Sequence, residues 1–592
     1  MKKLMLGNEA VARGLYEAGC SFVSSYPGTP STEITEFAAK YDEIYAEWAP
    51  NEKVAMESAF GACLTGQRTF CGMKHVGLNV AADPLFTISY TGVNGGMIIG
   101  VADDPGMHSS QNEQDSRHYA RASKIPMIEP SDSAEAIEYV KLAYEISEKY
   151  DTPVLLKMCT RVSHSQSVVE PGERVMPDSK PYAKDGDKYI MMPRQAKLRH
   201  PLVEKRTEDL KKLSENTPLN RVEKGKNSSI AVITDSTSYQ YVKEVLGDRF
   251  DILKLGLIWP VSENLIREFT EDRDKVIIVE ELDGFIEGLV KSLGIECSGK
   301  EYFSPIGELS QNQVRTGLAE ALHDDSLKPE PSEKERSYAV PNRPPVMCAG
   351  CPHRGLFYVL SKLKLNVIGD IGCYTLGAIE PLNAIDTTIC MGASISGIHG
   401  FNKASSFTDS KNETHTVAVI GDSTFMHSGM TGLVNIAYND SNSTVIILDN
   451  SITGMTGHQE NPTTGRNLKG DPALKVDLEA LCKAVGIESV RVVDPYDLKE
   501  TEKVIREEVK KECSSVVISR RPCALLKYVK HKPPIVPDKD KCTKCRMCMK
   551  IGCPAIMVTE KGVEIDHTLC VGCGVCSELC RFGALNGKEE QR

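Results

Sequence analysis

The stretch Cys542-Thr-Lys-Cys545-Arg-Met-Cys548-Met-Lys-Ile-Gly-Cys553-Pro decides the fold of the last fifty or so residues of this chain. A second stretch nearly repeats the spacing, with cysteines at 570, 573, 576 and 580. Three thiolates spaced three residues apart on a tight turn can hold three irons of one cubane, while the distant fourth cysteine crosses over to the other. The two stretches therefore predict two [4Fe–4S] centres.

This double pattern resembles the bacterial-type two-[4Fe–4S] ferredoxin module. The resemblance implies two ligand sets: Cys542, Cys545, Cys548 and Cys580; and Cys570, Cys573, Cys576 and Cys553. The sequence departs from the common pattern in two places. Four residues rather than three precede Cys553, and Cys580 is followed by Arg581 rather than proline. We expect both departures to change loop shape more than ligand number.

Zinc and disulfides are the alternatives for these cysteines. Zinc sites commonly use paired Cys-x-x-Cys units rather than two triplets, and disulfides require an oxidising compartment. The chain begins Met-Lys-Lys-Leu-Met-Leu-Gly-Asn-Glu, where an acidic residue arrives too early for a secretory signal. No apolar run approaches the ~20 residues of a membrane span. We therefore expect a cytoplasmic protein with reduced thiols and no membrane partner.

Size and charge set further limits. The 592 residues suggest several domains, since about 150 residues per domain is common. The 41% hydrophobic and 26% charged content is that of an ordinary globular protein. A net charge of −11 argues against nucleic acid as the main partner. A basic run at Lys527, Lys530, His531 and Lys532 suits an acidic redox partner as well as it suits an ordinary solvated surface.

Short apolar strands alternate with helices through most of the chain, which predicts an α/β fold with parallel sheets. Proline- and charge-rich stretches interrupt this pattern twice. We expect α/β domains at 1–170, 227–330 and 345–537, linkers at 171–226 and 331–344, and the iron–sulfur module at 538–592.

Two buried-type strands in the third α/β region end in polar residues, Asp422 and Asn450, 28 residues apart. Ligands bind at the carboxyl ends of parallel strands, and a carboxylate with an amide suits Mg²⁺ that also holds phosphate oxygens. The pair resembles the diphosphate-binding motif of thiamine diphosphate enzymes, although Ser423 replaces the usual glycine. The resemblance implies that Asp422, Asn450 and the carbonyl of Ile452 ligate Mg²⁺.

Four more cysteines surround this motif: Cys348, Cys351, Cys373 and Cys523. They resemble the proximal [4Fe–4S] ligands of 2-oxoacid:ferredoxin oxidoreductases, where the cluster takes electrons from the thiamine one at a time. Scattered cysteines are normally small buried side chains, and we expect that of the others: Cys20, Cys63, Cys71, Cys159, Cys297, Cys390, Cys482 and Cys513.

The first α/β region carries further family motifs. Tyr26-Pro-Gly-Thr29-Pro resembles the motif whose threonine contacts the substrate carboxylate, although a helix N-cap turn would read similarly. In Asn51-Glu-Lys-Val-Ala-Met-Glu57, the resemblance implies that Glu52 hydrogen-bonds the aminopyrimidine ring, with Glu57 as second candidate. An arginine that clamps the carboxylate in pyruvate-specific relatives is missing from the strand at Gly96. Possible substitutes are Arg117, Lys74, His75 and His458.

The order of motifs resembles the aryl-pyruvate branch of this family over nearly the whole chain. It implies a pyrimidine-binding-type domain at 1–170, a small transketolase C-terminal-like domain at 227–330 and a thiamine diphosphate/Mg²⁺ domain at 345–537. The implied activity is oxidative decarboxylation of aryl pyruvates such as indolepyruvate with coenzyme A, giving aryl-acetyl-CoA, CO₂ and reduced ferredoxin. The implied partner is a smaller β subunit in a heteromeric complex.

Three alternatives remain from the sequence. The substrate can be another 2-oxoacid, such as pyruvate or 2-oxoisovalerate. The chain can be a non-oxidative thiamine decarboxylase or carboligase, although eight intact cluster ligands disfavour that. It can also be an electron-transfer subunit without thiamine, which Asp422, Asn450 and Glu52 disfavour.

Overall fold

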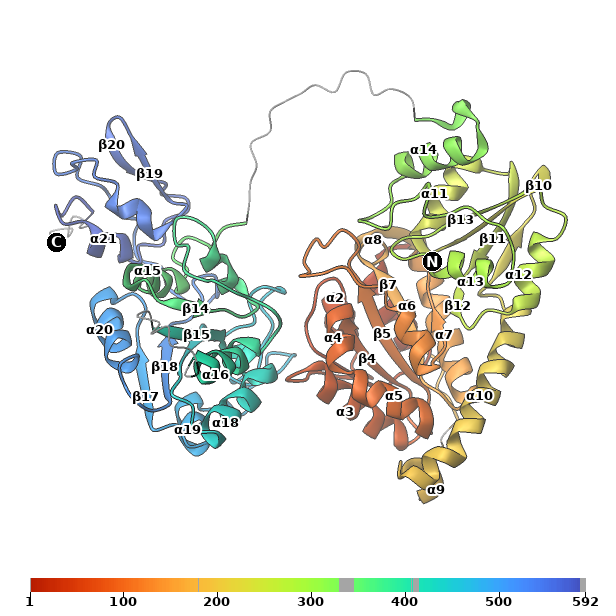
Figure 1. Cartoon of the computed structure of the whole chain (residues 1–592), viewed down its shortest axis with the longest axis horizontal. Helices are drawn as coiled ribbons and strands as arrows, with labels where there is room; N and C mark the ends of the chain where they lie inside the picture. Colours follow the sequence, from red (N-terminus) through yellow and green to blue (C-terminus); the bar gives the residue numbers. More distant parts are fainter. Residues whose placement is uncertain (1, 179, 330–344, 406, 408–414, 586–592) are drawn as a thin grey trace. The chain divides into compact units, whose positions relative to one another are not determined.

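The computed structural model describes residues 2–178, 180–329, 345–405, 407 and 415–585. The expected linker at 331–344 lies outside these residues. The chain forms two compact units, Met1–Ser337 and Tyr338–Arg592, whose elements are labelled in Figure 1. Both units contain parallel sheets with helices between the strands, so the α/β prediction is confirmed. The domain limits within each unit stay predictions.

A seven-stranded sheet forms the core of the first unit, in the order β12-β6-β7-β5-β4-β2-β3. Every pairing is parallel except that of β12 with β6. Three central strands are buried along their whole length, which explains their nearly continuous apolar sequences. The strands are β2 (Phe22–Ser25), β3 (Tyr45–Trp48), β4 (Thr69–Lys74), β5 (Met97–Asp103), β6 (Met127–Ile128), β7 (Val154–Cys159) and β12 (Leu257–Trp259).

Helices follow most of these strands. They are α1 (Gly7–Glu17), α2 (Thr32–Ala38), α3 (Glu52–Leu64), α4 (His75–Val80), α5 (Ala82–Thr91), α6 (Arg117–Ser123), α7 (Ser133–Tyr150) and α8 (Thr160–His164). Helix α3 begins where the Asn51 side chain accepts a hydrogen bond from the Val54 amide, a standard N-cap. Because that cap fixes the first turn, Glu52 stands at the N-terminus of α3. An antiparallel pair, β1 (Lys3–Leu6) and β8 (Gln166–Val169), joins the two ends of this region.

A smaller sheet in the same unit has the order β13-β10-β11-β9. Its elements are β9 (Arg221–Glu223), β10 (Asn227–Asp235), α11 (Ser236–Leu246), β11 (Phe250–Leu255), α12 (Glu263–Thr270), β13 (Lys275–Val279), α13 (Phe285–Ser292), α14 (Gln311–Leu322) and η1 (Asp325–Leu327). The next strand after β11 is β12, which leaves this sheet and pairs with β6 of the larger one. The small region therefore supplies an edge strand to the first sheet.

Buried ion pairs hold the two sheets of this unit together. Arg117 is fully buried, and its guanidinium contacts the carboxylates of Asp115, Asp235 and Glu280 at 2.6–3.1 Å. The equally buried Lys254 of β11 pairs with Glu135 of α7 at 2.6 Å. Because a buried charge is costly without a partner, these pairs fix the relative position of the sheets.

The segment at 171–226, expected as a linker, contains regular structure. It includes α9 (Gly186–Tyr189) and the long α10 (Pro193–Glu215), drawn in gold in Figure 1. One face of α10 is buried. On this face Val203 lies in the interior, and Arg206 donates a hydrogen bond to the Ser89 carbonyl. Helix α10 of this segment is therefore packed against the surface of the first unit.

The second unit contains a five-stranded parallel sheet with the order β14-β15-β16-β18-β17. The strands are β14 (Asn366–Ile368), β15 (Thr416–Gly421), β16 (Thr444–Asp449), β17 (Ser489–Val493) and β18 (Ser515–Arg520). The helices are α15 (His353–Leu363), η2 (Cys373–Ala378), α16 (Ala393–Ser405), α17 (Asp422–Thr424), the π-helical turn η3 (Phe425–Gly429), α18 (Met430–Tyr438), α19 (Leu478–Ala484) and α20 (Leu498–Glu508).

Side chains alternate between two apolar clusters along these strands. On β15, Val417 and Val419 belong to one cluster, whereas Ala418 and Ile420 belong to the other. The first cluster also contains Ile551, Val575 and other residues of the cysteine-rich end. This end comprises η4 (Met547–Ile551), β19 (Ile556–Thr559), β20 (Gly562–Ile565) and α21 (Val575–Leu579). The cysteine-rich module is therefore packed onto the sheet through a common core. Among the described helices, none has the length and apolar character needed to cross a membrane.

Candidate functional site

Asp422 and Asn450 stand side by side because the strands that precede them are neighbours in the sheet. Gly421 of β15 pairs with Leu448 of β16, and each polar residue follows its strand at the carboxyl end. Both side chains are buried, with 2% and 8% exposure. Asp422 Oδ2 accepts hydrogen bonds from the Ser451 amide (3.1 Å) and Thr463 Oγ1 (2.9 Å). The carboxylate is thus fixed at the N-terminus of α17.

The donor set at this edge fits an octahedral magnesium ion. One terminal atom of the Asn450 amide lies 2.7 Å from the Ile452 carbonyl oxygen and 3.2 Å from Asp422 Oδ1. Neighbouring oxygens around Mg²⁺ lie about 2.9 Å apart when metal–oxygen distances are about 2.0–2.1 Å. If this terminal atom is the Asn450 amide oxygen, it faces two other oxygens, the Ile452 carbonyl oxygen and Asp422 Oδ1. Oxygens so close together repel one another unless a cation lies between them. In the opposite amide orientation, the Asn450 nitrogen occupies this position and donates to both oxygens.

His353 supports the orientation that a cation requires. Burial lowers the pKa of this imidazole to about 4, so it is neutral near pH 7. Its Nε2 lies 3.4 Å from Nδ2 of Asn450 and can accept a hydrogen bond in the tautomer protonated at Nδ1. The amide oxygen then points toward Asp422. Burial and the nearby Asp449 carboxylate raise the pKa of Asp422 to about 7, which means that they disfavour its charged form. A bound cation would stabilise that charged form.

Ser423, the departure from the thiamine motif, lies in the same turn. Its Oγ accepts a hydrogen bond from Thr453 Oγ1 at 2.9 Å, and its backbone amide donates to Asp422 Oδ1 at 2.8 Å. The first amides of a helix favour phosphate because they point toward it without intrahelical partners. The serine therefore ties the loop after β16 to the helix start.

The four cysteines around this motif gather in one region. Cys523 donates its backbone amide to the Asn450 carbonyl at 2.9 Å, next to the proposed magnesium ligands. Burial raises the pKa of Cys373 and of Cys351, and neighbouring cysteines add to the rise: Cys523 and Cys348 for Cys373, and Cys373 and Cys348 for Cys351. Such mutual repulsion is expected where several thiols converge on a metal centre.

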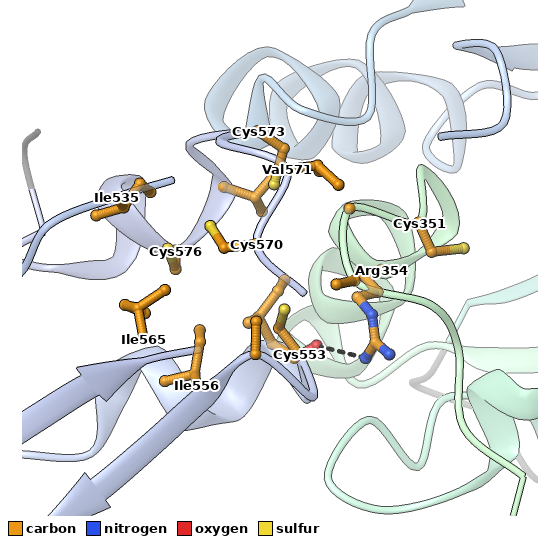
Figure 2. A pocket seen from close by; sticks show the side chains of 15 residues that line it. Cys351, Arg354, Ile535, Cys553, Ile556, Ile565, Cys570, Val571, Cys573 and Cys576 are labelled. Carbon is orange, nitrogen blue, oxygen red and sulfur yellow. Dashed lines mark hydrogen bonds between the residues drawn. The ribbon is translucent and has the colours of Figure 1, made fainter. Parts of the chain in front are cut away.

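The cysteine-rich module contains two cavities, and each gathers one of the predicted ligand sets. The first is lined by Cys553, Cys570, Cys573 and Cys576, as Figure 2 shows. The second is lined by Cys542, Cys545, Cys548 and Cys580. The last cysteine of each triplet-containing run thus reaches the cavity of the other run, as the ferredoxin resemblance implies.

In the first unit, Glu52 and Glu57 differ sharply in environment. Glu52 is 5% exposed, and its carboxyl group packs so closely on Gly77 that a Cβ there would come within 2.6 Å of Oε1. Glu57 has a 48% exposed side chain and pairs with Lys53 one turn away. The buried Glu52 is therefore the better candidate for contact with a cofactor.

Thr29 is half-buried at the carboxyl end of β2, and its neighbour Gly28 packs against the stem of Lys74. Burial lowers the pKa of Lys74, whereas Asp104 and Glu52 oppose that shift. Lys74 and Glu52 therefore share one neighbourhood, and the Lys74 ammonium donates to the Ser109 carbonyl at 2.8 Å.

The remaining substitutes for the missing arginine are less suitable. Arg117 is fully engaged by the carboxylates that join the two sheets. His75 is buried, with Nε2 3.3 Å from the Asn112 carbonyl oxygen. His458 lies in the second unit, with Nε2 4.0 Å from the Cys523 sulfur. Among the candidates in the first unit, Lys74 is the one whose stem packs against Gly28, the neighbour of Thr29.

Most cysteines expected as buried side chains are buried: Cys20, Cys63, Cys71, Cys159, Cys297 and Cys482. Cys513 is half-buried. Cys390 is exposed, so the expectation was wrong there. It lies in the loop between η2 and α16, which the local sequence does not distinguish from a buried turn.

Sequence reasoning did not single out His353, Arg354 or Thr463 for the site. The first two belong to the run Cys351-Pro-His-Arg, so their proximity to a candidate ligand was a usable signal. Thr463 lies in a loop, where no periodic pattern could show its contact with Asp422.

Three family models match separate parts of the chain. Residues 13–226 match "Pyruvate flavodoxin/ferredoxin oxidoreductase, thiamine diP-bdg", residues 370–519 match "Thiamine pyrophosphate enzyme, C-terminal TPP binding domain", and residues 563–586 match "4Fe-4S binding domain". Together with the fold, they define the class: a thiamine diphosphate-dependent oxidoreductase that carries iron–sulfur centres.

Curated relatives refine this class. The indolepyruvate oxidoreductase subunit IorA of Pyrococcus horikoshii is 39% identical over 100% of this chain and 97% of its own length. The subunit of the same name from Archaeoglobus fulgidus is 39% identical over 98% and 96%. The chain belongs to the family of indolepyruvate oxidoreductase IorA subunits. A solved chain of 2-oxoglutarate:ferredoxin oxidoreductase from Magnetococcus marinus aligns with a TM-score of 0.45 and 17% identity, over 55% of this chain and 65% of that chain.

Proposed function

We propose that this chain is the thiamine-binding subunit of an enzyme that oxidatively decarboxylates aryl pyruvates, with indolepyruvate as the representative substrate. Coenzyme A would accept the aryl-acetyl group, CO₂ would leave, and ferredoxin would receive two electrons. Family membership supports this proposal, because the curated relatives are named indolepyruvate oxidoreductase subunits. Their description as subunits supports a complex with a partner chain, which we propose is the smaller β subunit.

The observation that best supports an oxidative reaction is the adjacency of two candidate sites. The Cys523 amide donates to the Asn450 carbonyl, so a proposed cluster ligand stands beside a proposed magnesium ligand. Thiamine diphosphate, when bound, supplies the decarboxylation chemistry, and iron–sulfur clusters accept electrons singly. A simple decarboxylase needs no electron acceptor at this edge.

Each residue would have a defined task. Asp422, Asn450 and the Ile452 carbonyl would hold Mg²⁺, with Ser423 at the diphosphate. Glu52 would hydrogen-bond the aminopyrimidine ring, and Thr29 would contact the substrate carboxylate beside Lys74. Cys348, Cys351, Cys373 and Cys523 would hold a proximal [4Fe–4S] cluster, and the two ferredoxin sets would hold the other two.

The first test is the iron, acid-labile sulfide and thiamine content of anaerobically purified protein. About twelve irons per chain with bound thiamine is the expected result, because each cubane holds four. About eight irons would remove the proximal cluster and with it the direct path for electrons. Turnover with a panel of 2-oxoacids, in the presence of the smaller subunit, coenzyme A and ferredoxin, then tests the substrate. A preference for pyruvate or 2-oxoisovalerate would overturn the aryl-pyruvate proposal.

A further inference from the structure

Arg354, the second residue of α15, is a buried cation that ties together two cysteine loops. Its exposure is 5%. Its Nε donates to the Cys348 carbonyl at 2.9 Å, and a terminal nitrogen donates to the Met347 carbonyl. The other terminal nitrogen donates to the carbonyls of Ile551 (3.3 Å) and Gly552 (2.5 Å). One guanidinium therefore bridges the Cys348–Cys351 loop and the loop that ends at Cys553.

The hydrogen-bond partners of this guanidinium are all neutral. Its four described hydrogen bonds end on backbone carbonyls, and within the described part of the chain no carboxylate is paired with it. A buried charge without a counter-charge is costly. In the cavity that Arg354 lines, the groups able to carry negative charge are cysteines of the two sets, Cys351 and Cys553 among them. The compensating negative charge must come from the two cysteine sets.

The position of Arg354 lies between those sets. It lines the cavity of Cys553, Cys570, Cys573 and Cys576, together with Cys351. In Figure 2 the Cys351 sulfur points away from the ferredoxin sulfurs, with Arg354 beside it and bonded toward the Cys553 loop. The guanidinium therefore lies between the Cys351 sulfur and the Cys553 loop.

The contact with Arg354 explains the extra residue before Cys553. Gly552 has a φ of 68°, and a Cβ there would lie 2.9 Å from Pro381 Cδ and 3.1 Å from an Arg354 terminal nitrogen. The lengthened loop turns the carbonyls of Ile551 and Gly552 toward the guanidinium. A glycine is needed because both the left-handed conformation and the close approach exclude a side chain.

We propose that Arg354 is a positioning residue for electron transfer: it holds the loop of the proximal cluster against that of the adjacent ferredoxin cluster and stabilises the electron as it passes between them. This inference rests on the proposed function, which assigns clusters to both cysteine sets. Four thiolates outweigh the charge of a cubane, so each cluster is an anion, and reduction adds one negative charge. In each transfer the proximal cluster loses one electron and its neighbour gains one, with no bond or proton moved.

The test compares Arg354→Gln with Arg354→Lys in the complete complex. Both variants lose the fork of hydrogen bonds, but only lysine keeps the charge. A redox titration followed by electron paramagnetic resonance measures the midpoint potential of each cluster. The signal of the Cys570 cluster is identified as the one that Cys570→Ser alters. For this cluster we expect Arg354→Gln to lower the equilibrium constant for reduction about tenfold, which lowers the midpoint potential by about 59 mV for one electron. Arg354→Lys should recover most of that shift.

The more remote cluster of Cys542 is the internal control, because Arg354 does not line its cavity. Its potential should stay at the wild-type value. The inference would be overturned if the midpoint potentials of both ferredoxin clusters shifted equally or if neither shifted. It would also be overturned if the Gln and Lys variants shifted the potential of the Cys570 cluster by the same amount. If Arg354→Gln fails to assemble its clusters, Arg354→Met is the second test, since it also removes the charge and should shift the same signal alone. Iron content separates the two proposals: eight irons in the wild type contradicts the proximal cluster, whereas twelve irons with unchanged potentials contradicts only the role of Arg354.

Discussion

Replacement of Asp422 by asparagine tests the magnesium site most directly. The change keeps the size of the side chain and one oxygen for the Ser423 amide, but it removes the negative charge that faces the Asn450 amide and the Ile452 carbonyl. A hydrogen bond or ligand contact to a charged group contributes about 1.5–3 kcal/mol. The upper half of that range corresponds to a loss of about one hundredfold in affinity for Mg²⁺–thiamine diphosphate, since 1.4 kcal/mol is tenfold.

Thermal unfolding measures this loss without requiring turnover. At a cofactor concentration one hundred times its Kd, binding stabilises the wild type by about 2.7 kcal/mol. With one hundredfold weaker binding, the same concentration stabilises Asp422→Asn by only about 0.4 kcal/mol. The cofactor-free variant should be at least as stable as the wild type, because burial disfavours the charged form of Asp422, whose pKa is raised to about 7.

The matched control is Asp440→Asn, the same exchange at an exposed position after the crossover helix α18. It should retain the full stabilisation by cofactor. If Asp422→Asn is stabilised as strongly as the wild type by Mg²⁺ and thiamine diphosphate, the oxygen cluster is not the magnesium site and the reasoning is refuted.

Three further predictions follow from the site and the core. Glu52→Gln should lower turnover by about a hundredfold to ten-thousandfold, as expected for a lost proton-transfer group, with cluster content unchanged; a similar loss in the exposed control Glu57→Gln would show that the assignment is wrong. Cys373→Ser should lower the iron content from about twelve to about eight atoms per chain, whereas the control Cys390→Ser should leave it unchanged; iron assays decide between them. Arg117→Met should lower the free energy of unfolding of the first unit by about 3–5 kcal/mol, because it leaves buried carboxylates unpaired; a shift below 1 kcal/mol in urea denaturation would contradict that role.

Local patterns predicted much of the fold. The short apolar runs that predicted an α/β fold do form strands: β13 spans the run Lys275–Val279, and the runs at 229–234 and 96–101 overlap β10 and β5. The spacing of 28 residues between Asp422 and Asn450 leaves room for one crossover helix, and α18 occupies that place. These elements are long or strongly apolar, so their own sequence specifies them. Strand β12 was not expected, because three residues carry too weak a pattern and its partner β6 lies far away in the chain.

The site divides in the same way. Asp422 and Asn450 could be identified because each ends a strand whose pattern is visible, and neighbouring parallel strands bring their ends together. The grouping of the ferredoxin cysteines was implied by the resemblance of their spacing to the two-cluster ferredoxin module. Arg354 could not be assigned from sequence, because its acceptors at Ile551 and Gly552 lie almost two hundred residues away. Every residue has a backbone carbonyl, so the sequence does not show which carbonyls accept hydrogen bonds from an arginine.

The pairing of β12 with β6 has a consequence for synthesis on the ribosome. Strand β6 emerges at Met127–Ile128, but its antiparallel neighbour follows only at Leu257–Trp259. Until then the nascent chain carries an uncovered sheet edge, a common starting point for aggregation. The exposed strand has only two residues, which limits how firmly a second nascent chain could attach. The larger sheet is thus completed only after the first strands of the small region have been synthesised, and a chain released before Trp259 would lack its outermost strand.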